Sequence, residues 1–152
     1  MILTTHALAG AAIGKNFSNP WIIIILSLII HYIMDSFRHG EYLNRKSTLE
    51  NTWWKVALDL FFAMAIVGFF IIFKNPKPSE TFSILLGSFF SMLPDLFTVL
   101  YWKLNFKILK KLFLFHAWIH KYPPFSPERA WTLRNSANDI IFSLIAILLL
   151  FF

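Results

Sequence analysis

The sequence predicts an all-α protein, a polytopic bundle of membrane helices that forms a single integral membrane domain over residues 1–152. Hydrophobic residues make up 57% of the chain and charged residues only 14%, whereas a soluble domain carries about 25% charged residues. The apolar residues form long runs that recur along the chain. Because a backbone exposed to lipid must satisfy its own hydrogen bonds, each run is expected to be a helix.

Four apolar segments approach the ~20 residues that a helix needs to cross a bilayer. They are Pro20 to Asp35, Val56 to Phe73, Phe82 to Tyr101 and Asp139 to Phe152. We therefore expect four transmembrane helices, the first of which begins at the Asn19-Pro20 pair. A fifth segment, Ile2 to Gly14, is short and rich in Ala and Gly, and predicts a helix that either re-enters or spans the membrane.

The long connection before the last segment carries a basic amphipathic pattern. Lys103, Lys107, Lys110 and Lys111 fall at helical spacing, with apolar residues between them. This pattern predicts a helix in the membrane interface, with these lysines against anionic lipid headgroups. The net charge of +6 is therefore assigned to membrane lipid, and no nucleic-acid partner is expected.

The positions of Lys and Arg predict the orientation in the membrane. With four crossings, Lys15, Lys74 and Lys77 lie on one side, and every other basic residue lies on the other. The positive-inside rule places the second side in the cytoplasm. We expect a protein of a bacterial or archaeal cytoplasmic (inner) membrane whose long basic loops are cytoplasmic.

Asp and Glu occupy different parts of the predicted structure. Every Glu falls in an expected loop, and every Asp falls within or at the end of an apolar helix: Asp35, Asp59, Asp95 and Asp139. A charge near the bilayer centre costs at least ~2.5 kcal/mol and usually marks function. Counting ~1.5 Å per residue from the outer turns places the last three of these Asp in the cytoplasmic half, together with His6 and His31.

The spacing of the histidines indicates a metal site. His31, Asp35 and His39 recur every four residues, as do His116 and His120, and this spacing stacks side chains on one helix face. The candidate ligands are His6, His31, Asp35, His39, Asp95, His116 and His120, with Asp59 and Asp139 behind them. Imidazole and carboxylate donors suit a divalent ion, Zn first and Mn or Fe as alternatives. The candidates exceed one tetrahedral site, so one or two ions are expected.

Several of these residues also have a plainer structural explanation. His39 precedes Gly40 and is placed to help end a helix. Asp95 and Asp139 each lie where a nearby helix N-terminus favours a carboxylate. His116 and His120 equally fit the water-exposed face of the interfacial helix. The metal interpretation rests on the combined pattern rather than on any one side chain.

Three short motifs resemble those of a known family. The motifs are Thr4-Thr5-His6-Ala7-Leu8-Ala9-Gly10, the block His31-Tyr32-Ile33-Met34-Asp35 with His39, and Leu93-Pro94-Asp95. They are similar to motifs of the bacterial membrane-bound, metal-dependent hydrolase family, whose members associate with the inner membrane. The family's His-Arg-x2-Thr-His-Ser block is absent, and its nearest counterpart is His116-Ala-Trp-Ile-His120. The His-x3-Asp pattern also bears a weaker similarity to the zinc-dependent phospholipase C and single-strand nuclease superfamily.

These observations together predict a membrane-embedded metal-dependent hydrolase at the cytoplasmic interface. A metal-activated water would attack a lipid-like or phosphoester substrate, while Asp59 or His39 would orient ligands or move protons. The chain contains no cysteine, which excludes thiolate ligands and a cysteine nucleophile. The alternative is a non-catalytic membrane scaffold, a lipid-binding protein or an ion- or proton-handling protein. The uncharged outer halves of the helices count against a path through the membrane.

Overall fold

The computed structural model describes residues 1–42 and 47–152, and this part of the chain contains helices and one isolated bridge, between Glu41 and Ala130. The α-helices are α1 (Leu3–Asn16), α2 (Pro20–Asp35), α3 (Leu49–Lys74), α4 (Pro78–Trp102), α5 (Lys110–Ile119) and α6 (Leu133–Phe151), with short 3-10 turns at Lys107–Leu109 and Pro127–Arg129. The predicted all-α class is confirmed for the described residues.

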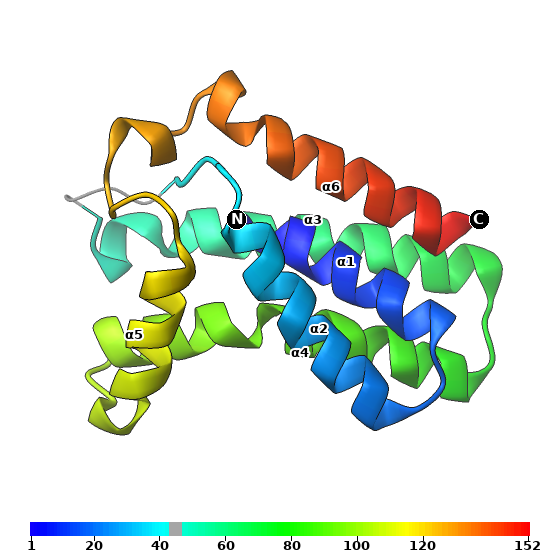
Figure 1. The fold of residues 1–152 in the computed structure, drawn as a ribbon. Helices are drawn as coiled ribbons and strands as arrows, with labels where there is room; N and C mark the ends of the chain where they lie inside the picture. Colours follow the sequence, from blue (N-terminus) through cyan, green and yellow to red (C-terminus); the bar gives the residue numbers. More distant parts are fainter. Residues whose placement is uncertain (43–46) are drawn as a thin grey trace.

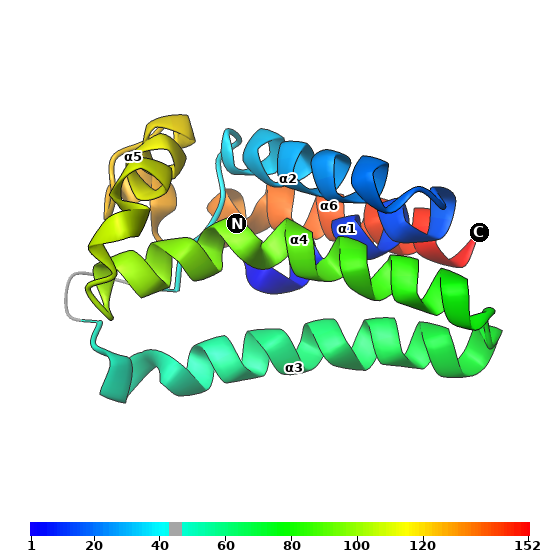
Figure 2. The same ribbon diagram turned by 90° about the horizontal axis from the view of Figure 1, so that it is seen from below.

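Helix α1 lies at the centre of the bundle and contacts α2, α3, α4 and α6 (Figure 1). The view turned by 90° shows α3 on one side of α1, with α2 and α6 on the opposite side (Figure 2). Every residue from Thr4 to Ala12 is buried. The short N-terminal segment is therefore the inner helix of the bundle, wrapped by the longer helices.

Three helices are long and apolar enough to cross a membrane: Glu50–Lys74, Pro78–Trp102 and Leu133–Phe151. Helix α2 has 16 residues, or about 24 Å at ~1.5 Å per residue, which is less than the ~30 Å of a bilayer core. Length and composition thus support three of the four expected crossings, and the crossing by α2 stays a prediction.

Helices α3 and α6 begin about two turns before the apolar runs that predicted them. Threonine caps explain the difference. The Thr48 hydroxyl oxygen accepts from the Asn51 backbone N–H, and the Thr132 hydroxyl oxygen accepts from that of Asn135, both at 3.3 Å. A threonine N-cap allows a polar first turn to be helical, so an apolar run understates the length of such a helix.

The backbones of α1 and α4 touch. A Cβ atom built on Gly10 would lie 2.1 Å from the Gly87 carbonyl oxygen, and one built on Gly14 would lie 2.0 Å from the Ser83 carbonyl oxygen. Glycine and serine permit such an approach between membrane helices, where packing and hydrogen bonds replace the hydrophobic effect as the driving force. The contact fixes the register of α1 along α4.

Two carboxylates from other helices hold the N-terminus of α1. Asp59 of α3 accepts from the backbone N–H groups of Leu3 at 2.7 Å and Thr4 at 2.9 Å. Asp139 of α6 accepts from the Ile2 N–H at 3.0 Å. The first N–H groups of a helix have no partner within the helix, and its positive dipole end favours anions. Both Asp residues therefore anchor α1 inside the bundle.

The predicted amphipathic helix through the four lysines is wrong as a single element. Helix α4 ends at Trp102 and α5 begins at Lys110. Between them, Asn105 has a φ of 61°, a left-handed conformation that interrupts a right-handed helix. Helix α5 buries His116 and exposes apolar side chains such as Trp118.

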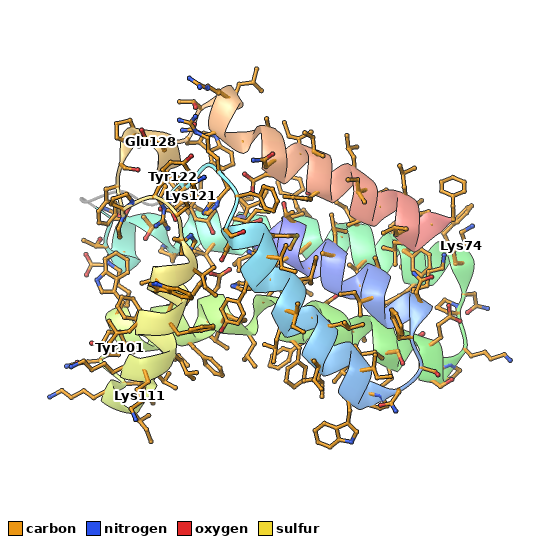
Figure 3. The ribbon with its side chains drawn as sticks, viewed as in Figure 1. Lys74, Tyr101, Lys111, Lys121, Tyr122 and Glu128 are labelled. Atoms are coloured by element: carbon orange, nitrogen blue, oxygen red, sulfur yellow. The ribbon has the colours of Figure 1, made fainter. Side chains whose placement is uncertain are left out.

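The two ends of the bundle differ in charge as the orientation argument requires. Lys111 and Lys121 lie at the end that carries α5, and Lys74 lies at the opposite end (Figure 3). Arg45 and Lys46, which contribute to the same argument, lie outside the described residues. The cytoplasmic assignment of the α5 end stays a prediction.

The α1–α4 contact predicts a sharp effect of one methyl group. In Gly87→Ala the new Cβ would lie 2.1 Å from the Gly10 carbonyl oxygen, so the helices must separate. Overpacking of this kind lowers the free energy of unfolding by ~1–3 kcal/mol. We expect a lower midpoint of thermal unfolding in detergent. The matched control is Gly68→Ala on α3, where a Cβ meets nothing within 4 Å and helix propensity favours Ala by ~1 kcal/mol. Equal midpoints for the two variants would contradict the close contact.

Candidate metal centre

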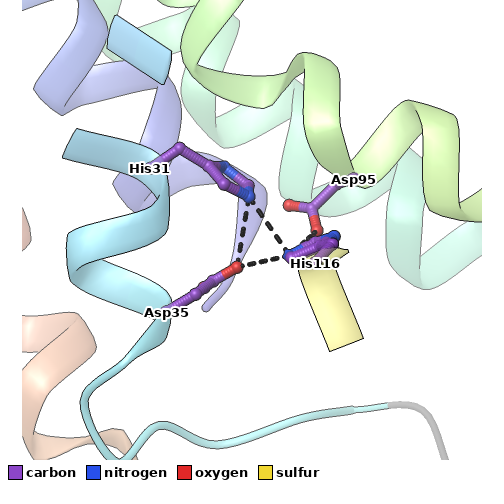
Figure 4. A group of neighbouring side chains, drawn as sticks. All are labelled: His31, Asp35, Asp95 and His116. Carbon is purple, nitrogen blue, oxygen red and sulfur yellow. Dashed lines mark hydrogen bonds and ion pairs between the residues drawn. The ribbon is translucent and has the colours of Figure 1, made fainter. Parts of the chain in front are cut away.

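Three helices bring four donor side chains together around Asp35. His31 and Asp35 come from α2, Asp95 from α4 and His116 from α5 (Figure 4). One ligand atom from each lies within 4.8 Å of the others, and we call these four residues the first donor set. His31 and Asp35 are fully buried, whereas the Asp95 side chain is 26% exposed. The set is thus closed on the side of α2 and partly open beside Asp95.

The backbone of α4 fixes the orientation of His31. The His31 Nδ1 atom lies 2.7 Å from the Ser91 carbonyl oxygen. A carbonyl oxygen only accepts, so Nδ1 carries the proton and donates. In a neutral imidazole the other nitrogen then holds a lone pair, and His31 Nε2 presents this lone pair to Asp35 Oδ2 at 3.2 Å.

A relay through Thr98 fixes His116 in the same way. The Thr98 hydroxyl donates to the Pro94 carbonyl oxygen at 3.1 Å. In the tautomer that carries its proton on Nδ1, which a metal ligand at Nε2 needs, His116 donates to Thr98 Oγ1 at 2.8 Å. His116 Nε2 is left with a lone pair, 2.8 Å from Asp35 Oδ2.

With both neutral imidazoles in the Nδ1–H tautomer, their Nε2 atoms and Asp35 Oδ2 are acceptors with no donor between them. His31 Nε2 and His116 Nε2 lie 3.2 Å apart, and both face the same Asp35 oxygen. Buried acceptors that face one another are unfavourable unless a cation or proton lies between them. One added proton satisfies a single pair of these atoms, whereas a divalent cation satisfies all of them. A histidine whose second nitrogen donates to an oxygen is also the usual arrangement of a metal ligand.

A second donor set shares Asp35. Among the described residues, ligand atoms of Asp35, His39 and His120 also lie within 4.8 Å of one another. His39 Nδ1 donates to the Phe37 carbonyl oxygen at 2.9 Å, and its buried Nε2 has no hydrogen-bond partner. Burial lowers the pKa of His39 to about 4 and the pKa of His120 to about 3. Both imidazoles are therefore neutral at pH 7, which is the form that binds metals.

His6 lies beside the first donor set without belonging to it. Its Nε2 is 3.2 Å from Asp35 Oδ1 and 3.7 Å from Asp95 Oδ2, and its ring stacks on His31 at 4.0 Å. The Met1 amino group lies 2.5 Å from the same Asp35 Oδ1. Donation from His6 to the two carboxylates fits this placement better than the predicted direct coordination.

The structure separates Asp59 and Asp139 from both donor sets. Asp59 accepts from Tyr42 at 3.3 Å in addition to the start of α1. Asp139 Oδ2 accepts from the Gly40 N–H at 3.2 Å. Their contacts position α1 and the loop that follows α2, while the catalytic role predicted for Asp59 stays a prediction. Ser91 and Thr98 were missed in the sequence, because neither a contact to a backbone carbonyl nor one to a single hydroxyl forms a motif.

A cavity of about 490 Å³ lies next to the second donor set. Its lining includes Glu41, Lys55, Arg129 and Trp131. Glu41 connects the cavity to the donor set, because Glu41 Oε1 lies 3.6 Å from His39 Nε2 and also pairs with the Arg129 guanidinium. Burial lowers the pKa of Arg129 to about 10, so it stays charged at pH 7. The cavity therefore holds two cations and one anion.

Comparisons with protein-family models, with curated proteins and with solved structures find no match to this chain. The resemblance to membrane-bound hydrolases accordingly stays a prediction.

The first donor set predicts that the chain binds a divalent metal. Purified wild-type protein, stripped with a chelator and then loaded with Zn²⁺, should retain the ion through desalting. His31→Ala/Asp35→Ala should lose the ion from this set, because the variant removes two of its four side chains. Elemental analysis measures the bound metal. Absence of metal from the wild type, or equal metal in both proteins, would contradict the site.

The relay through Thr98 predicts a smaller, graded effect. Thr98→Val removes the acceptor that fixes His116, and such a change typically weakens metal affinity 10–100-fold. Competition with a chromophoric chelator measures the affinity. The matched control is Thr81→Val, 17 residues earlier on α4 and thus about 25 Å away along the helix. An affinity unchanged in Thr98→Val, or equally weakened in both variants, counts against the relay.

Proposed function

We propose that this chain is a membrane-embedded, metal-dependent hydrolase of a bacterial or archaeal cytoplasmic membrane, with a zinc ion held by His31, Asp35, Asp95 and His116. The observation that carries this proposal is the pair of imidazole nitrogens, His31 Nε2 and His116 Nε2, that face each other at 3.2 Å over a buried carboxylate. Two polarised histidines and a carboxylate are a donor set that zinc favours; Mn²⁺ and Fe²⁺ are the alternatives to test.

The chemistry proposed is hydrolysis of a phosphoester. Zinc bound here would take water as a fifth ligand, beside the partly exposed Asp95, and would lower the pKa of that water to ≈ 7 and polarise the scissile group. The chain's own residues orient the donors: Ser91 and Thr98 hold the two imidazoles, and His6 supports the carboxylates. In the overall reaction a bond forms between phosphorus and the water oxygen, the ester bond to phosphorus breaks, and the leaving alcohol receives a proton.

The surroundings of the site support an anionic substrate at the membrane surface. Arg129 and Lys55 line the 490 Å³ cavity, which reaches His39 through Glu41, and guanidinium and ammonium groups are common phosphate partners. Trp131 is 56% exposed there, and Trp is enriched at the level of lipid headgroups. A lipid-like phosphoester, with its headgroup in this cavity, fits these contacts. Lys103, Lys107, Lys110 and Lys111 would add attraction to anionic lipid.

Hydrolysis of a phospholipid tests the proposal. Zinc-loaded wild-type protein in mixed micelles with phosphatidic acid or phosphatidylglycerol should release inorganic phosphate or a soluble headgroup, and a chelator should stop the release. His31→Ala/Asp35→Ala should fall to the rate without enzyme, whereas Gly68→Ala, far from the donors, should keep the wild-type rate. The same headgroup esters without acyl chains separate a lipid substrate from a soluble phosphoester.

The result that would overturn the enzymatic proposal is metal-loaded, folded wild-type protein that hydrolyses none of these esters. Such a protein would belong to the non-catalytic class, as a scaffold, a lipid-binding protein or an ion-handling protein.

A further inference from the structure

The second donor set contains a buried imidazole nitrogen, His39 Nε2, that is not a ligand in the single-ion centre. His39 is 2% exposed, and its Nε2 has no hydrogen-bond partner, while the Phe37 carbonyl holds the proton on Nδ1. A buried nitrogen lone pair without a donor is costly. It also faces other acceptors, since Glu41 Oε1 lies 3.6 Å from it.

The neighbours of His39 are metal donors. The His39 and His120 rings lie 5.1 Å apart, and His120 Nε2 lies 3.6 Å from Asp35 Oδ2. The same oxygen lies 2.8 Å from His116 Nε2 in the first donor set. Asp35 Oδ2 is thus shared by imidazole nitrogens of both donor sets.

We propose that His39, His120 and Asp35 bind a second divalent cation, so that Asp35 bridges a two-metal centre. This inference rests on the metal centre proposed above and extends it. Three protein ligands leave a position for water, which is the pattern of a catalytic rather than a structural zinc site. Carboxylate bridges hold two ions at ~3.5–4 Å in hydrolases that clamp a phosphoester between them.

Binding of a second ion would make His39 a metal ligand. The sequence predicted His39 both as a candidate ligand and as a residue that orients ligands or moves protons, and the geometry favours the ligand role. Glu41 Oε1 is the nearest further oxygen, and its pairing with Arg129 ties the second ion to the cavity. The second ion would therefore face the anionic group of the substrate, while the first lies deeper between α2, α4 and α5.

Metal stoichiometry tests the inference without depending on activity. Full-length protein with a C-terminal tag is stripped, loaded with Zn²⁺, desalted and subjected to elemental analysis. We expect two ions per chain in the wild type and in Gly68→Ala, and one in His39→Ala and in His120→Ala. Thermal unfolding establishes that each variant is folded, and His39→Gln provides a second, more conservative variant. Loading with Mn²⁺ should give an exchange-coupled electron paramagnetic resonance signal in the wild type and an uncoupled one in His39→Ala.

The possible outcomes separate the two proposals. One ion in the wild type, retained in His39→Ala and lost in His31→Ala/Asp35→Ala, would overturn the second site and leave the proposed function standing. No ion in the wild type would overturn both. Two ions in the wild type with an uncoupled Mn²⁺ signal would overturn the bridge by Asp35.

Discussion

The approach of α1 to α4 is the constraint on which the site depends. A Cβ on Gly87 would come within 2.1 Å of the Gly10 carbonyl oxygen, so only glycine permits this crossing. His6 precedes Gly10 by one helical turn, and Ser91 follows Gly87 by one turn. Because the helices run antiparallel, both residues emerge on the same side of the crossing. The contact therefore sets His6 against the carboxylates and turns the Ser91 carbonyl towards His31.

The polar centre is stable in an apolar bundle only if its charges are balanced locally. Asp35 is fully buried, and a buried carboxylate is tolerated where cations or hydrogen bonds surround it. Met1 and His6 lie within reach as donors to Asp35 Oδ1. With His31 donating to Ser91 and His116 to Thr98, Asp35 Oδ2 faces the lone pairs of these two imidazoles. These relays leave Asp35 Oδ2 without a donor from either imidazole, which favours a cation at that oxygen. They are the arrangement that a metal ion requires.

Much of the fold followed from apolar run length, but the arrangement of the site did not. The Asn19-Pro20 start of α2 and the i, i+4 spacing of His31 and Asp35 are local features, and the structure contains both. The capping of α1 by Asp59 and Asp139 joins residues 55 or more positions apart, and no local pattern encodes it. The break at Asn105 similarly depends on a single φ angle. The segment after it folds back and brings His116 into contact with Asp35. The i, i+4 spacing of His116 and His120 was compatible with this contact but did not determine it.

The asymmetry of the bundle connects the site to its proposed substrate. Leu8, Ala11, Ile84 and Leu150 form part of a packed apolar core beyond the donors, and the buried polar residues in the same region, Ser27, Ser83 and Ser88, are uncharged. Access remains beside Asp95, whose side chain is partly exposed, and at the cavity lined by Arg129. A proton or ion pathway needs polar groups on both sides of its central site, whereas a hydrolase needs one open side. The one-sided distribution of charge, together with the cations that line the cavity, supports the proposed headgroup-bearing substrate over a translocated ion.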